Sequence, residues 1–94
     1  MAQETLVSII STFFGIQVRM YFADHGPPHM HVEYQGQEAL IEIGTGAVLA
    51  GGLPKRALSL VRQWRVDHVE ELAQNWVRAQ ALQPLMRIPG ADND

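Results

Sequence analysis

The chain has 94 residues, of which 47% are hydrophobic and 18% charged, a composition typical of one small globular domain. It contains no cysteine, which excludes disulfides and thiolate metal sites. The net charge of −3 argues against strong nonspecific nucleic-acid binding, which usually needs a basic surface.

We expect a single domain over residues 1–94, with an ordered core from about residue 8 to residue 82 and a tail over 83–94, of which Pro89–Asp94 is polar and frayed. The segment Met1–Thr5 lacks the basic start of a signal peptide. The apolar run Leu6–Phe14 is too short to span a bilayer. A small domain without disulfides is more often cytoplasmic than secreted, so we expect a cytoplasmic protein with no membrane association.

The first half of the chain has the pattern of a small antiparallel sheet. The apolar residues of 6–14 fit either a helical stripe or an extended lead-in. Residues 16–22, 29–34 and 37–43 alternate apolar and polar side chains, as strands with one buried face do. Residues 47–50 fit a short fourth strand or an extended lead-out. The expected fold is therefore α+β, with a meander of three to four strands.

The second half predicts a long helix. Residues 55–82 contain neither glycine nor proline, their apolar residues recur at helical spacing, and Pro54 suits the first helical position. Asp67, with a glutamate three residues later, resembles a capping box and indicates a break there. We favour one continuous or kinked helix over two separate ones. It should pack on one face of the sheet and bury Trp64 and Leu72.

The hairpin between the two central strands has a predictable register. Residues 35–36 are Gln-Gly, which reads as a two-residue turn with glycine available for positive φ. Counting back from this turn places His29 opposite Glu42 and His31 opposite Leu40. These side chains should lie on the face away from the helix, which an antiparallel sheet can leave in water.

The first strand extends this polar face. One register consistent with the alternation places Arg19 beside His31 and Tyr21 beside His29. The alternate positions then form one apolar layer for the helix to cover: Ile16, Val18, Met20, Phe22, Met30, Val32, Ala39, Ile41 and Ile43.

The polar face could carry chemistry. His29 and His31 are two residues apart on one strand, roughly 6.5–7 Å at Cα. Such a pair can share a divalent metal such as Zn²⁺, with His25 or Glu42 as a third ligand. Without metal, a histidine could act as acid or base and an arginine as an anion clamp. The candidate catalytic residues are Arg19, Tyr21, His29, His31 and Glu42, and the candidate metal ligands are His25, His29 and His31.

A second interpretation stays open. The same face could be a solvated surface of ordinary histidine–glutamate and arginine–tyrosine pairs. The basic helix residues Lys55, Arg56, Arg62 and Arg65 are most simply a solvated helix face, and RNA binding gains support only if they align with Arg19.

The segment Arg19–Val32, and above all Pro-Pro-His-Met-His-Val at 27–32, resembles a bacterial family, the domain of unknown function 4160. The similarity covers about residues 8–80 and includes Gly36–Ala39, the turn at 51–54, Trp64–His68, Glu71-Leu72 and Trp76. The resemblance singles out Arg19, Tyr21, His25, Pro27, Pro28, His29 and His31.

Members of that family are often encoded beside another small domain of unknown function, in arrangements that resemble toxin–antitoxin pairs. The resemblance therefore implies a toxin–antitoxin-like or regulatory gene pair, a ligand or catalytic site at the His-rich hairpin, and a small partner protein or a second copy as partner. One alternative is an RNA-cleaving enzyme using histidine, arginine, tyrosine and glutamate. Another is a protein-interaction or dimerisation module whose histidines are structural.

Overall fold

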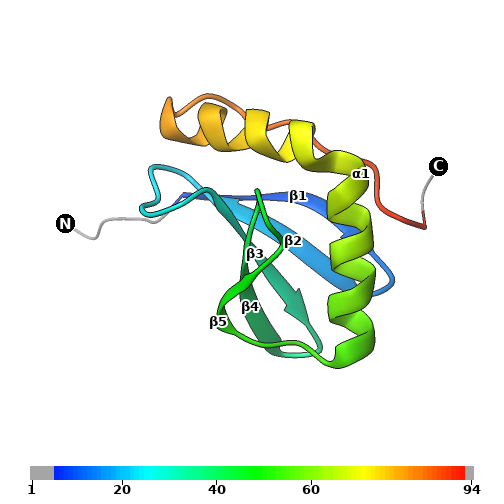
Figure 1. The fold of residues 1–94 in the computed structure, drawn as a ribbon. Helices are drawn as coiled ribbons and strands as arrows, with labels where there is room; N and C mark the ends of the chain where they lie inside the picture. The colour runs from blue at the N-terminus through cyan, green and yellow to red at the C-terminus, as the bar shows by residue number, and fades with distance from the viewer. Residues whose placement is uncertain (1–5, 93–94) are drawn as a thin grey trace.

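A computed structural model describes residues 6–92, and within them the chain forms five strands and one long helix (Figure 1). The elements are β1 (Val7–Phe13), β2 (Ile16–Tyr21), β3 (His29–Tyr34), β4 (Gln37–Glu42), β5 (Val48–Gly51) and α1 (Lys55–Gln80). The strands form one antiparallel meander in chain order. The α+β class is confirmed, but the expectation of three to four strands is wrong.

The additional strand is β1, for which the sequence left a helical stripe open. It pairs with β2 from Val7 to Phe13, with a bulge between Ile9 and Ser11. A bulge inserts one extra residue and interrupts the alternation of faces. Ile10 and Ser11 are consequently both buried although they are adjacent. The buried Ser11 is polar, whereas Leu6, Ile9 and Phe14 are apolar but exposed, so the apolar pattern does not follow the buried face and the period of two was hidden here.

The register of the central hairpin is confirmed. Gln35 and Gly36 both have positive φ, 49° and 82°, as a two-residue turn that follows the twist of its strands requires. His29 pairs with Glu42, and His31 pairs with Leu40. On the other side of β3, the ladder with β2 ends at the expected pair of Arg19 and His31.

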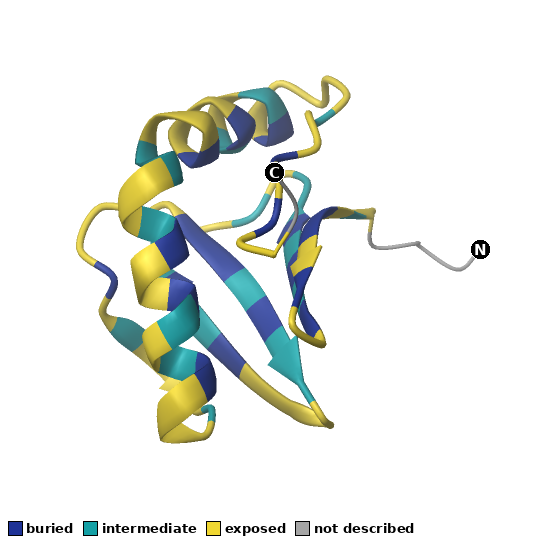
Figure 2. Ribbon diagram, turned by 90° about the vertical axis from the view of Figure 1, so that its right-hand side faces the viewer, coloured by how far each residue is buried: buried dark blue, intermediate teal, exposed yellow. Residues whose placement is uncertain are grey.

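The core lies between α1 and the face of the sheet that carries the apolar layer (Figure 2). Of the expected apolar layer, Phe22 is partly buried and all the other members are buried. Trp64 and Leu72 are buried in the same cluster as Val18 and Met20, as expected. The ring of Trp64 packs against Phe13 of β1, with 5.0 Å between ring centroids.

The helix is continuous but kinked at His68, whose φ of −130° and ψ of 21° are not helical. This confirms the expected kinked helix with a break near residue 67. The imidazole Nδ1 of His68 donates to the Glu71 carboxylate (2.6 Å). The first half of α1 runs along the sheet, whereas the second half crosses the end of the sheet where β3 begins (Figure 1). Among residues 6–92, no helix is both long and apolar enough to cross a membrane.

Residues 83–92, which we expected to form a tail with a frayed end from Pro89, pack on the domain. The side-chain amide of Asn75 is buried, donates to the carbonyl of Met86 (2.8 Å) and accepts from its N–H (2.9 Å). Ile88 is buried, and its N–H donates to the carbonyl of Ile10 on β1 (2.8 Å). The segment therefore packs back on the domain because a buried amide and an unpaired strand edge bind its backbone. Residues 1–5 and 93–94 lie outside the described part.

Replacing Trp64 by alanine should lower the free energy of unfolding by about 3–5 kcal/mol, because a large buried side chain leaves a cavity. The change also removes the indole N–H that donates to the Pro89 carbonyl (2.8 Å) and so loosens the C-terminal segment. Urea denaturation measures the effect. Val66→Ala, at a position 62% exposed on the same helix, is the control and should change stability by about 0.5 kcal/mol or less. Equal stabilities of the two variants would contradict this packing.

Candidate metal centre

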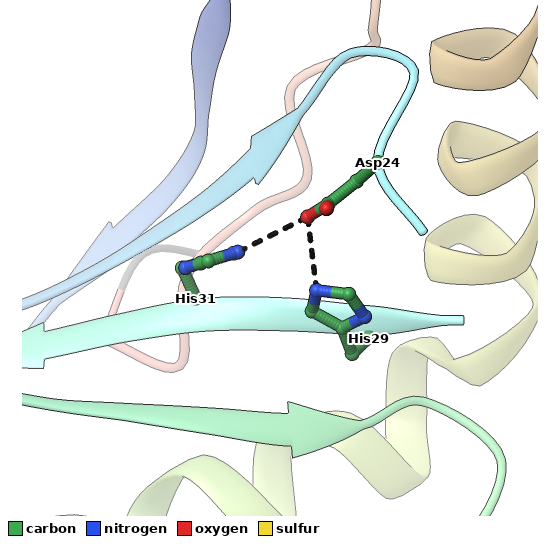
Figure 3. A group of neighbouring side chains, drawn as sticks. All are labelled: Asp24, His29 and His31. Atoms are coloured by element: carbon green, nitrogen blue, oxygen red, sulfur yellow. Dashed lines mark hydrogen bonds and ion pairs between the residues drawn. The ribbon is translucent and has the colours of Figure 1, made fainter. Parts of the chain in front are cut away.

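Asp24, His29 and His31 converge at the start of β3 (Figure 3). The two histidines share one face of β3 because they are two residues apart, and Asp24 reaches them from the loop between β2 and β3. Oδ2 of Asp24 lies 2.9 Å from Nε2 of His29 and 3.3 Å from Nε2 of His31. The ligand atoms of the three residues all lie within 4.8 Å of one another.

The hydrogen bond on the far side of the His29 ring decides its protonation. Nδ1 lies 2.9 Å from the carbonyl oxygen of Pro27, which can only accept, so Nδ1 carries a proton. In a neutral imidazole, Nε2 then presents a lone pair to the Asp24 carboxylate. That contact is repulsive unless a positive charge lies on it, either a proton on Nε2 or a metal ion between the two atoms.

Burial is uneven across the cluster. His29 is 5% exposed, and its ring packs against Trp76 from the second half of α1, with 5.2 Å between ring centroids. The expectation of a solvated face is therefore wrong at this end, because the helix kink brings Trp76 over the beginning of β3. The side chains of His31 and Asp24 keep 15% and 27% of their area exposed, so the cluster opens to solvent on their side.

The carboxylate of Asp24 is held in its charged form. Burial raises its pKa, but the N–H of His25, which donates to Oδ1 (2.9 Å), and the imidazoles of His31 and His29 outweigh this and lower the pKa overall. The carboxylate thus remains an anionic ligand at any pH at which the histidines can bind a metal.

Two predicted residues lie on the same face but are engaged with neighbours. The guanidinium of Arg19 forms an ion pair with Glu38 across the sheet, which neutralises the proposed anion clamp. The ring of Tyr21 packs against His31, with 4.3 Å between ring centroids, rather than beside His29. Both residues border the cluster without contributing a ligand atom to it.

The other two candidates are not brought into the cluster. His25 is exposed, and only its backbone N–H contacts Asp24. Glu42 pairs with His29 in the ladder, but its carboxylate accepts from the hydroxyl of Thr45 (2.6 Å). The residue that sequence reasoning missed is Asp24. The available signal was an acidic residue opening a loop that two prolines stiffen directly before the His-x-His strand.

Arg62 and Arg65 of α1 bind the turn between β4 and β5. Nε of Arg62 donates to the carbonyl of Gly46 (3.0 Å). Arg65 donates to the carbonyls of Ile43 (2.7 Å) and Gly44 (2.8 Å). These arginines therefore hold the turn between β4 and β5 against the helix and do not extend a basic surface from Arg19.

The family model described as Domain of unknown function (DUF4160) matches residues 15–77, more than half of the chain. The protein belongs to the DUF4160 family. The matched part of this DUF4160 protein contains all three residues of the cluster. The comparisons found no match among curated proteins and none among solved structures.

The uneven burial predicts unequal costs for removing the two histidines. His29→Ala should lower the free energy of unfolding by about 1–3 kcal/mol, because it leaves the Pro27 carbonyl and the Asp24 carboxylate without a buried partner. His31→Ala should cost less, because its ring is nearer to solvent. Urea denaturation at pH 7.5 with a chelator present measures both without any contribution from metal. A larger loss for His31→Ala would contradict the assignment of His29 as the buried member.

Proposed function

We propose that this protein is a small bacterial metal-binding protein that holds Zn²⁺ or a similar divalent ion at Asp24, His29 and His31. It would act, through that site, as one component of a toxin–antitoxin-like or regulatory gene pair. The observation that carries the metal is the approach of two imidazole Nε2 atoms to one carboxylate oxygen, with the outer nitrogen of His29 already bonded to a carbonyl.

The two distances from Asp24 to the imidazoles suit a metal of this class, and all three ligand atoms lie within 4.8 Å of one another. Ligands about 2.0–2.1 Å from a tetrahedral zinc ion are about 3.3–3.4 Å from each other. The observed separations of 2.9 Å and 3.3 Å from Asp24 Oδ2 differ from this by a few tenths of an ångström at most. Two histidines and a carboxylate form a nitrogen–oxygen donor set, which Zn²⁺ and neighbouring transition metals accept. The Pro27 carbonyl supplies the outer hydrogen bond that metal-binding histidines usually make.

Three protein ligands leave at least one position of a tetrahedral ion for water or another ligand. The exposed sides of Asp24 and His31 are where that position would open. This arrangement supports an exchangeable or reactive ion more than a purely structural one. Membership of the DUF4160 family supports the gene-pair part of the proposal, because members of the family are often encoded beside another small domain. The lack of cysteine supports a cytoplasmic setting.

The contact between His29 and Asp24 also favours a second candidate, in which a proton takes the place of the metal. A buried imidazolium–carboxylate pair could serve acid–base chemistry such as RNA cleavage. The charges around it support this less well. Arg19 is paired with Glu38, Arg62 and Arg65 are bonded to a turn, and the net charge is −3. The metal therefore remains the better account of the cluster.

Adding Zn²⁺ to metal-free protein should raise its melting temperature. A ligand that binds only the folded state stabilises it by about 2.7 kcal/mol at a free concentration 100 times Kd. For a domain of this size, that corresponds to a shift of roughly 10–20 °C. Differential scanning fluorimetry or calorimetry at pH 7.5 measures it, and the shift should shrink at pH 5 because protonated imidazoles do not bind metal.

Asp24→Asn and His31→Ala should each abolish most of this shift. His25→Ala is the matched control and should keep it, because that side chain lies outside the cluster. No shift in the wild type would reject the metal and favour the proton. A shift that survives both ligand variants would place the metal elsewhere. If the double histidine variant unfolds and the wild type shows no metal effect, the histidines are structural, as in an interaction module.

A further inference from the structure

The loop that carries Asp24 is held by the second half of α1. The N–H of Ala23 donates to the carbonyl of Ala79 (3.1 Å). The side-chain amide of Gln80 donates to the backbone carbonyl of Asp24 itself (3.0 Å). Trp76, one turn earlier on the helix, packs on the ring of His29. One stretch of helix therefore contacts two of the three residues of the candidate centre, although it provides no ligand atom.

These contacts exist because the helix changes direction at His68. The second half turns away from the axis of the first half and reaches the loop between β2 and β3 (Figure 1). Leu72 and Asn75 fasten this half to the core and to the C-terminal segment. In its last turn, Ala79 is buried in the core, and the Ala79 carbonyl and the Gln80 side chain also bind the Asp24 loop, so this loop is one support of the helix end.

The charge at the end of the helix favours a cation at the cluster. The carbonyl groups at the C-terminal end of a helix carry a partial negative charge and favour a cation nearby. Here the helix ends at Gln80. The carbonyl of Ala79 accepts from the N–H of Ala23, the residue before Asp24. A metal ion at the cluster would therefore interact favourably with this helix end.

We propose that metal binding and docking of the second half of α1 are coupled, with Gln80 as a positioning residue for the metal. This rests on the proposed metal site. The docked helix end holds Asp24 and His29 in the converged geometry, so the ion meets preformed ligands and less ordering is required when it binds. By thermodynamic reciprocity, the bound ion stabilises the docked helix by the same factor. Metal binding at the site thus increases the order of the C-terminal end of α1.

The affinity for the metal alone gives the first test. Gln80→Ala removes one hydrogen bond to the ligand-bearing loop and should weaken Zn²⁺ binding about fivefold in isothermal titration calorimetry. Gln74→Ala is the matched control, because Gln74 is an exposed residue of the same half of the helix. It should bind Zn²⁺ like the wild type.

Hydrogen exchange gives a second readout, which a merely structural role of Gln80 would not move. On adding Zn²⁺ to the wild type, amide exchange should slow more over residues 69–80 than over residues 55–67. The difference should be absent in Asp24→Asn and reduced in Gln80→Ala. Equal Zn²⁺ affinity of Gln80→Ala and wild type, or equal slowing of both helix halves, would overturn the coupling while leaving the metal site intact. Absence of Zn²⁺ binding by the wild type would overturn the metal site and the coupling with it.

Discussion

The position of β3 in the sheet depends on a two-residue turn, and the candidate site depends on the position of β3. Gln35 and Gly36 both have positive φ and form a two-residue turn. This turn fixes the register in which β3 pairs with β4. A slip by one residue would exchange the faces of the strand, turning His29 and His31 into the core and Met30 out of it. Burial of the apolar face enforces the same register, so the fold cannot form without also presenting the two histidines together.

The two imidazoles beside the Asp24 carboxylate favour a cation, because one of the two rings is buried and its outer nitrogen is already bonded. His29 is nearly inaccessible to water, its Nδ1 proton is committed to Pro27, and its Nε2 faces Asp24. The Asp24 carboxylate lies against that inner nitrogen, so a positive charge between the ring and the carboxylate makes the contact favourable. Burial raises the pKa of Asp24, but the N–H of His25 and then the imidazoles of His31 and His29 outweigh this effect and lower the pKa overall, so the carboxylate supplies the negative charge of the cluster. The helix end beside the loop adds a further negative contribution, which makes a cation at this place more favourable still.

The parts of the structure that follow a period of two could be predicted from the sequence. The register of His29 and His31, and the apolar layer on the opposite face, are of this kind. β1 was obscured because its bulge interrupts the alternation, Ser11 is buried although polar, and Ile9 and Phe14 are exposed although apolar. Asp24 and Trp76 reach the histidines through a loop and through a helix kink. Such contacts depend on tertiary geometry, which local patterns do not encode. The family resemblance singled out the hairpin that carries the candidate site but gave no role for Asp24, whose carboxylate contacts both imidazoles.

Crystals grown with Zn²⁺ test the central claim most directly, through an anomalous difference map recorded at the zinc absorption edge. The account predicts one strong peak about 2.0–2.1 Å from Nε2 of His29, Nε2 of His31 and a carboxylate oxygen of Asp24. It also predicts that Nδ1 of His29 remains bonded to Pro27. A map with no peak at this position, or with the zinc bound at His25 or Glu42 instead, would contradict it.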